Sequence, residues 1–580
     1  MMTDHIKYFL LIATLSVLSL VLTSCANIPS GEPSTTNAVS SQSTDAKNLA
    51  TIDRLLSNRD ISGAHSLLTR MEAKTSLPAS TKAILWLQRS QWHVLKKDYS
   101  SALRVLTRLH KPASFALLNQ SSQLKALLLK AIAQENTQQY FAAIKTRITI
   151  SERKLAQTTY NQNHLAISRL LSQPSTFELL AQQRKERNSI YQQWIALRLL
   201  LNRTDLPLDK QWVLLDRWLK ANPKHPAAID PLPEMVALER AHAMPAANNI
   251  AVILPFTGPY SALADAIRAG ITDKRKLSNY QPSIMFYDSG PDFISTYNTI
   301  ANSDVDLIIG PLLKDNLKKL VALPKLPVIT IALNRLDDAP STHNSLYQFG
   351  LSAIDEINSL VNYATANSMK KAIIVYQDST WAKGQAEQFA SAWKKQGNDL
   401  LLQQPLAEAV NQSSQIQSFL PYISYPPNIT NEAKALRPKP IAGKSVDFIA
   451  LFSKGLPAQS MRPLMIFHQA AHVPVLTTSS IYRSYPIPAI DRDFQGVLFT
   501  DLPVVFDRDA IPKAYHNSDL IRLYAFGLDA LLLAEKLPLL TVSESVKLDG
   551  KTGSITLKKN MFNRVVPMAE FTQDGIKPIP

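Results

Sequence analysis

Few residues in this chain have the types and the spacing of catalytic or metal-binding groups. Gly443-Lys444-Ser445 matches the end of a phosphate-binding loop, but Pro438 stands where that motif requires its earlier glycine. His468 and His472 are four residues apart and can share one helix face, yet no third metal ligand is evident for them. The chain has neither an H-E-x-x-H nor a G-x-S-x-G segment. We therefore predict no catalytic residue, no metal site and no cofactor.

One residue has the position of a lipid-attachment site. Cys25 is the only cysteine, and it ends the run Leu22-Thr23-Ser24-Cys25. Lys7 precedes the apolar segment Tyr8 to Leu22, whose 15 residues fall short of the roughly 20 that span a membrane. These features resemble the signal peptide and lipobox of bacterial lipoproteins. The resemblance implies that residues 1–24 are removed and that Cys25 carries the lipid, palmitate included. An ordinary signal peptide followed by a chance cysteine is the alternative.

The residues after Cys25 bear on where the chain is held. Ala26 stands where an aspartate would argue for inner-membrane retention. The resemblance therefore implies the outer membrane, with the chain facing the periplasm. Residues 25–47 are rich in Ser, Thr, Pro and Asn and lack an apolar period, which predicts a flexible tether.

Positive charge is concentrated in the amino half of the chain. Ala26 to Asn249 contains 29 basic and 16 acidic residues, a net charge of +13, whereas Ile250 to Pro580 has a net charge of only +3. A basic half indicates an anionic partner, such as an acidic protein surface, anionic lipid or cell-wall polymer. Nucleic acid is excluded as a partner outside the cytoplasm. A basic surface that is merely solvated is an equally good interpretation.

Residues 48–245 have the apolar spacing of successive helices. Asp60-Ile61-Ser62-Gly63-Ala64 recurs 38 residues later as Asp98-Tyr99-Ser100-Ser101-Ala102, and a looser copy begins at Gln139. The repeat resembles the second-helix signature of tetratricopeptide repeats, whose usual period is 34 residues. It implies an all-α helical solenoid with a curved, protein-binding surface. A plain helical bundle is the alternative. The tryptophans expected in its core are Trp86, Trp92, Trp194, Trp212 and Trp218.

Residues 250–580 alternate between short apolar runs and helical segments, which predicts a doubly wound α/β arrangement in two halves. We expect the switch between the halves near residues 334–350, a helix cap at Ser261 and Pro311 in the first turn of a helix. Asp399 to Lys444 is predicted to be a long insertion and is our candidate docking loop. The predicted strands are Ile250–Leu254, Ser283–Tyr287, Asp306–Gly310, Pro327–Ile331, Lys371–Tyr376, Phe448–Phe452, Pro474–Thr477 and Gly496–Thr500.

These segments resemble the type I periplasmic binding proteins. The opening strand, loop and helix are IAVILPFTGPYSALADAIRAGI, the next units are DLIIGPLLKDNLKKL and LPVITIALN, and the second lobe starts at AIIVYQDSTWAKGQAEQFASAWKKQG. The last helix and the closing hairpin are RLYAFGLDALLLAEKL and LDGKTGSITLKKNMFNRVVPMAEF. The resemblance implies a two-lobed α/β domain over nearly all of residues 250–580.

The resemblance also implies a cleft between the lobes, outside the carboxyl ends of the strands. In solute-binding members, small hydroxyl residues often follow the third strand and hold a ligand carboxylate, whereas this chain has Leu312, Leu313 and Lys314 there. We therefore favour a cleft that is empty or shut over a small-molecule site. The predicted cleft residues are Thr257, Gly258, Tyr260, Gly310, Pro311, Asn334, Asp378, Trp381, Phe452 and Ser453.

A lipobox, a tetratricopeptide-like half and a binding-protein-like half together resemble the outer-membrane lipoproteins that activate bifunctional class A penicillin-binding proteins. The resemblance implies a regulator, not an enzyme, that binds such a synthase in the periplasm and stimulates its peptidoglycan transpeptidase activity in cell-wall synthesis. Peptidoglycan itself is a further candidate partner. The alternative is a lipid-anchored receptor for an amino acid or similar solute. An enzyme acting on cell-wall glycan or peptide lacks support in the motifs.

Overall fold

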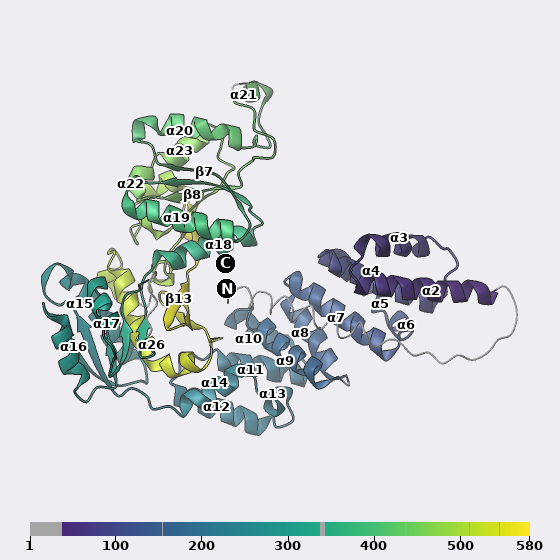
Figure 1. Ribbon diagram of the computed structural model, residues 1–580, viewed down its shortest axis with the longest axis horizontal. Coiled ribbons are helices and arrows are strands. Elements are labelled where there is room, and N and C mark those ends of the chain that lie inside the picture. The colour runs from purple at the N-terminus through teal and green to yellow at the C-terminus, as the bar shows by residue number, and fades with distance from the viewer. Residues whose placement is uncertain are drawn as a thin grey trace. The chain divides into compact units, whose positions relative to one another are not determined.

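The computed structural model describes residues 38–153, 155–336, 343–435, 437–509, 511–544 and 546–579 (Figure 1). The predicted signal peptide, Cys25 and the tether up to residue 37 lie outside the described residues. By compactness the chain divides into two units: the first runs up to Arg203 and includes Val213–Val236, and the second contains Thr204–Trp212 and everything from Ala237 onward. Of the helices described, none is long and apolar enough to cross a membrane.

The first described helix begins inside the predicted tether. α2 (Ala38–Ser57) includes residues 38–47, so the prediction of a flexible segment is wrong there. Ile52 and Leu56 anchor the carboxyl half of this helix in the core, at 0 % and 1 % exposure. Because helix formation is cooperative, the preceding turns extend the same helix. Asp45 also pairs with Lys74 at 2.5 Å.

The predicted repeat corresponds to three helices that start in the same way. Each follows a residue with a positive φ angle; the helices are α3 (Ile61–Glu72), α5 (Tyr99–Leu109) and α8 (Tyr140–Ser151), and the residues are Arg59, Lys97 and Gln138. The carboxylates of Asp60 and Asp98 cap α3 and α5 by accepting backbone N–H bonds of 2.8 and 3.2 Å. Ala64, Ala102 and Ala143 are fully buried, and the small side chain lets each helix pack closely on the one before it. The prediction of a helical amino half is therefore confirmed.

The other helices of the amino half are α4 (Ala79–Leu95), α6 (Pro112–Phe115), α7 (Gln120–Asn136), α9 (Gln157–Leu171), α10 (Thr176–Lys185), α11 (Ser189–Leu201), α12 (Leu208–Ala221), α13 (Pro226–Ile229) and α14 (Pro233–His242).

Histidine and tryptophan rings fill the core of the first unit near its end. His164 and His225 are each 2 % exposed, and the rings of Trp194 and Trp218 lie 4.6 and 4.8 Å from that of His225. Tyr160 packs against His164 at 3.8 Å. Burial lowers the pKa of both histidines from 6.5 to about 4, so both are neutral at neutral pH. Trp92, Trp194 and Trp218 are buried as predicted, while Trp86 and Trp212 are half-buried.

The second unit begins with an eight-stranded sheet of order β11-β12-β13-β5-β4-β3-β1-β2. The first five strands of the chain run parallel to one another, as the predicted α/β alternation requires. The last three strands of this sheet extend it beyond β5: β13 is parallel to β5, and β12 and β11 follow as antiparallel neighbours. The strands are β1 (Asn249–Leu254), β2 (Ser283–Asp288), β3 (Leu307–Ile309), β4 (Ile329–Ala332), β5 (Leu346–Gln348), β11 (Leu548–Gly550), β12 (Gly553–Lys558) and β13 (Met561–Val565). The helices of this first lobe are α15 (Ser261–Leu277), α16 (Phe293–Ala301) and α17 (Lys314–Val321), with a short turn η1 (Gly258–Tyr260).

The second lobe has a seven-stranded sheet of order β15-β14-β10-β9-β8-β6-β7. Alternate residues of β6 and β8 enter two cores on opposite faces of this sheet, for example Ile373 and Leu451 on one face and Ile374 and Phe448 on the other. The strands are β6 (Lys371–Tyr376), β7 (Asp399–Pro405), β8 (Phe448–Phe452), β9 (Val475–Thr477), β10 (Val497–Thr500), β14 (Met568–Thr572) and β15 (Gly575–Ile579). The helices are α18 (Ala353–Ala366), α19 (Thr380–Lys395), α20 (Gln412–Phe419), α21 (Asn431–Ala435), α22 (Gly455–Ala458), α23 (Met461–Phe467), α24 (Pro488–Asp491) and α25 (Pro503–Phe506). Single turns are η2 (Ala409–Asn411), η3 (Leu420–Tyr422), η4 (Ser479–Ile481), η5 (Arg492–Phe494) and η6 (Lys513–Tyr515).

A long helix, α26 (Ile521–Val542), ties the two lobes together. It starts in the core of the second lobe and then packs along α15 of the first lobe. Two glycines allow the close approach: a Cβ on Gly270 would lie 2.1 Å from the Tyr524 carbonyl oxygen, and one on Gly527 would lie 2.1 Å from the Ile267 carbonyl oxygen.

Three local predictions in the second unit are wrong. Ser261 is the first residue of α15 and makes no capping hydrogen bond, because η1 precedes the helix and supplies its start. Pro311 forms a cis peptide bond with Gly310 three residues before α17, so it is not in the first turn of that helix. Asp399–Lys444 is not one loop: it contains β7, which pairs in parallel with β6, and α20, which packs on α23.

Candidate functional site

The predicted cleft residues are divided between the two lobes, and only two of them line the pocket that the lobes share. Asn334 of the first lobe and Trp381 of the second line a pocket of about 320 Å³. Asp378 lines a different pocket of about 600 Å³ within the second lobe. Phe452 and Ser453 are fully buried, so they support the sheet instead of facing a ligand.

The remaining predicted cleft residues serve the local structure of the first lobe. The Asp288 carboxylate accepts hydrogen bonds from the Thr257 hydroxyl (3.0 Å) and from the backbone N–H groups of Phe256 (2.6 Å) and Gly290 (3.1 Å). Burial alone would raise the pKa of Asp288, but these hydrogen bonds outweigh it and lower the pKa. Gly310 is required for packing, because a Cβ there would lie 2.2 Å from a backbone oxygen of β1. Thr257, Gly258, Tyr260, Gly310 and Pro311 line none of these pockets.

A pocket of about 740 Å³ lies in the second lobe, beside the start of α26. Its wall includes Glu356, whose carboxylate accepts hydrogen bonds from Ser479 N–H (2.7 Å), the Ser479 hydroxyl (2.9 Å) and the Thr500 hydroxyl (2.9 Å). Burial raises the pKa of Glu356, and these hydrogen bonds oppose the shift. Trp381 also lines this pocket. The acid is therefore engaged by the protein itself.

One cation of the same pocket is engaged as well. The Arg522 guanidinium forms two bonds with the fully buried Asp501, from Nε at 2.9 Å and from Nη2 at 2.5 Å. Burial would lower the pKa of Arg522, but Asp501 raises it. Lys454, Arg483, Asp491 and Asp519 also line this pocket, together with the hydroxyl groups of residues 478–480. No group of three metal-binding side chains occurs among the described residues.

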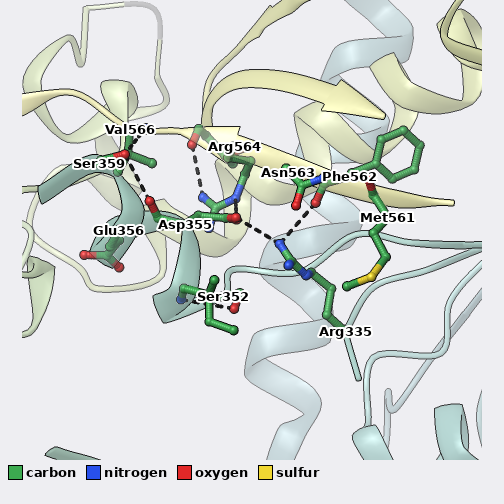
Figure 2. A network of polar contacts seen from close by, with 12 residues as sticks. Arg335, Ser352, Asp355, Glu356, Ser359, Met561, Phe562, Asn563, Arg564 and Val566 are labelled. Carbon is green, nitrogen blue, oxygen red and sulfur yellow. Dashed lines mark hydrogen bonds and ion pairs between the residues drawn. The ribbon is translucent and has the colours of Figure 1, made fainter. Parts of the chain in front are cut away.

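A buried ionic network joins the lobes where the chain crosses between them (Figure 2). The Asp355 carboxylate, on the first turn of α18, accepts hydrogen bonds from Arg335 Nη1 (2.9 Å) and Arg564 Nε (3.1 Å). Arg335 follows β4 and Arg564 belongs to β13, so two first-lobe elements hold one second-lobe helix. The side chains of Arg335, Asp355 and Arg564 are 5 %, 2 % and 1 % exposed. Burial raises the pKa of Asp355 although both guanidinium charges oppose it.

Backbone groups complete this hinge network. Arg335 donates to the Phe562 carbonyl (3.2 Å), and Arg564 donates to the Thr552 carbonyl (3.1 Å). Ser359 accepts from the Val566 N–H at the second crossover (3.1 Å). Figure 2 shows that Glu356, the next residue of α18, points away from the two arginines. Glu356 lines the 740 Å³ pocket. The hinge network therefore fixes the two lobes beside the 740 Å³ pocket, but Arg335, Asp355 and Arg564 are not part of the wall of that pocket.

Sequence reasoning missed the hinge network. Asp355 and Arg564 are 209 residues apart in the chain. No local spacing links such residues, and only the fold brings them together.

The fold defines a class of protein: a tetratricopeptide-like helical region followed by a two-lobed α/β domain of the type I periplasmic-binding-protein kind. The chain belongs to the LppC putative lipoprotein family, whose sequence profile matches residues 34–573. The penicillin-binding protein activator LpoA of Vibrio cholerae is 22 % identical over 546 residues, covering 87 % of this chain and 86 % of that protein. LpoA of Vibrio antiquarius is 24 % identical over 417 residues, 67 % of each chain. A structure of Haemophilus influenzae LpoA is 19 % identical, covers 92 % of this chain and 94 % of its own, and has a TM-score of 0.57. The similarity to the solved structure shows a common fold.

Proposed function

We propose that this chain is an activator of a penicillin-binding protein, a regulator without enzymatic activity. In finer terms, it binds a bifunctional class A penicillin-binding protein in the periplasm and stimulates its peptidoglycan transpeptidase activity. The observation that carries the proposal is the similarity to LpoA over nearly the whole chain, helical half and two-lobed half together. A transport receptor has no need of the first of these halves.

The chemistry of the pockets supports a regulator. The two most buried charged side chains in the 740 Å³ pocket are engaged within the protein, Glu356 by hydroxyl and N–H donors and Arg522 by Asp501. Activation without catalysis requires only that binding favour the active conformation of the synthase. Such a protein needs a stable docking surface and no nucleophile, base or metal.

The place of action follows from the proposed lipid anchor. Lipidation of Cys25 would hold the chain at the outer membrane, facing the periplasm, and the helical region would span part of the distance to the synthase. The net charge of +13 on residues 26–249 also suits contact with anionic peptidoglycan on the way. These three points are parts of the same proposal.

A retention and activity experiment tests the proposal. In the retention assay, the full-length chain is immobilised and incubated with a purified class A penicillin-binding protein from the same bacterium. In the activity assay, the synthase makes peptidoglycan from lipid II with and without the chain, and the cross-linking of the peptides in that product is measured. We expect retention and a rise in the fraction of cross-linked peptides. Absence of both contradicts the proposal.

A second candidate is a receptor for an amino acid or similar solute, which the 740 Å³ pocket favours. Isothermal titration calorimetry of the full chain against amino acids tests it. Micromolar or tighter binding would support the receptor, and absence of heat at millimolar ligand would exclude it.

A further inference from the structure

The carboxyl end of α23 exposes two large apolar side chains on the second lobe. Ile466 is 54 % exposed and Phe467 is 75 % exposed, whereas Met461 and Met465 of the same helix are buried in the core beneath. This short helix therefore has apolar side chains both on the face that packs against the core of the second lobe and at its solvent-exposed carboxyl end. Adjacent exposed apolar residues with a polar rim are typical of protein-binding surfaces.

A basic segment, residues 424–435 and 437–444, contacts the residues that directly follow α23. Arg437 Nη1 donates to the carbonyl of Gln469, only two residues beyond Phe467 (3.3 Å). At the start of the segment, the Ser424 hydroxyl lies 3.4 Å from His472 Nε2. Figure 1 shows α21, which belongs to this segment, at the outer edge of the second lobe. The charged residues of the segment are Lys434, Arg437, Lys439 and Lys444, against the single acid Glu432.

Arg437 has one guanidinium edge without an acceptor. Its Nη1 bonds to Gln469, and its carbon lies 5.6 Å from the centre of the Tyr425 ring. Among the described residues, neither Nε nor Nη2 has a hydrogen-bond partner, although both atoms are covered from solvent. These two N–H groups form the fork that binds a carboxylate through two parallel hydrogen bonds. A buried N–H group of a cation costs free energy when it has no acceptor. Binding of a carboxylate is therefore favourable here, once the protein atoms that cover these two N–H groups move aside.

We propose that Ile466, Phe467, Tyr425 and Arg437 form the docking face for the penicillin-binding protein, which we call the α23 face. Its occupant is an acidic segment of the partner: a carboxylate binds the free edge of Arg437, and an apolar side chain packs on Phe467 and Ile466. The four cations of residues 424–444 attract this segment. The inference rests on the proposed function and adds to it the surface and the chemistry of the contact.

Affinity measurements on surface variants test the α23 face. The lipidated full-length chain in detergent is titrated with the purified class A synthase, and the dissociation constant is measured by biolayer interferometry at 50 and 300 mM NaCl. The test variants are Phe467→Ser and Arg437→Glu, with Arg437→Lys to separate charge from the fork. Two matched controls lie on the first lobe: Leu277→Ser, an apolar residue 80 % exposed at the end of α15, and Lys319→Glu, an exposed cation of α17.

We expect Phe467→Ser to weaken binding about 10-fold and Arg437→Glu at least about 30-fold, as for residues that carry much of an interface. Arg437→Lys loses part of the affinity, because it keeps the charge without the fork. Both controls stay within about twofold of the wild type, and the wild-type affinity falls at 300 mM NaCl. Phe467 is a surface residue, so its variant stays informative if Arg437→Glu fails to fold, which circular dichroism reveals.

Each other outcome has a definite meaning. Wild-type binding with unchanged affinity for Phe467→Ser and Arg437→Glu overturns the α23 face but leaves the proposed function standing. Absence of wild-type binding overturns the proposed function, and the inference with it. If Phe467→Ser abolishes a dimer in sedimentation velocity while the synthase affinity is unchanged, the face binds a second copy of the chain, and the inference is wrong.

Discussion

Removal of the acid at the centre of the hinge network should destabilise the second unit selectively. Asp355→Ala leaves two guanidinium groups, on Arg335 and Arg564, buried at 5 % and 1 % exposure without their shared counter-charge. Loss of one partner from a buried ionic group typically costs about 3–5 kcal/mol. For a unit of this size that corresponds to a fall in melting temperature of about 4–7 °C. Differential scanning calorimetry of the full chain measures it, and we expect the transition of the first unit to stay unchanged.

Two controls separate the loss of a buried charge from the loss of any ion pair. Asp315 pairs with Lys318 at 3.1 Å, but its side chain is 86 % exposed, so Asp315→Ala should change the melting temperature by no more than about 2 °C. A triple variant that replaces Arg335, Asp355 and Arg564 by Met, Leu and Met should regain most of the lost stability, since no charge remains to be neutralised. A melting temperature of Asp355→Ala within about 1 °C of the wild type would refute the reasoning.

Three further results are expected. Gly527→Ala should destabilise the second unit by about 1–3 kcal/mol in urea unfolding, because its Cβ meets a backbone oxygen of α15 at 2.1 Å, whereas Gly384→Ala, with nothing within 4 Å, should be neutral or stabilising. Burial lowers the pKa of His164 and His225 to about 4, so the unfolded chain takes up protons below pH 6.5 that the folded chain does not. This stability is present above pH 6.5 and is lost as the pH falls, by about 3 kcal/mol for each histidine at pH 4. The difference between the melting temperatures at pH 7.5 and 4.5 should therefore narrow in His164→Phe, in which His225 still contributes. Cys25→Ser should move the chain from the membrane fraction to the soluble fraction, and retention at the membrane would contradict the proposed lipid anchor.

Elements with a strong local pattern could be predicted from the sequence. The buried strand Phe448–Phe452 has the predicted bounds, because five consecutive apolar residues are typical of a parallel strand covered on both faces. The repeat was visible because Asp60 and Asp98 cap their helices and Ala64 and Ala102 permit close packing, so each residue type has a local physical reason.

Elements whose pattern is weak or whose partner is distant were missed. β7 is an edge strand that contains Gln403, Gln404 and Pro405, so its composition is that of a loop. β5 has only three residues, and its place is set by β4 on one side and β13 on the other. Asp355 reads as one more surface charge until the fold places two arginines around it, since burial of a charge has no signature in the sequence.

The hinge network also bears on the choice between regulator and receptor. A receptor that closes on a solute rotates its lobes about the crossover segments, and those segments must absorb large changes in backbone angles. Here Ser359 holds the second crossover through Val566, and Asp355, just after the first crossover, is fixed by two first-lobe arginines. Rotation would separate these buried charges, which costs more free energy than a few hydrogen bonds to a small solute return. A docking surface gains from the same rigidity, because a preorganised face loses less conformational entropy when the partner binds. The network therefore favours a protein that presents a fixed surface to a macromolecule over one that closes around a ligand.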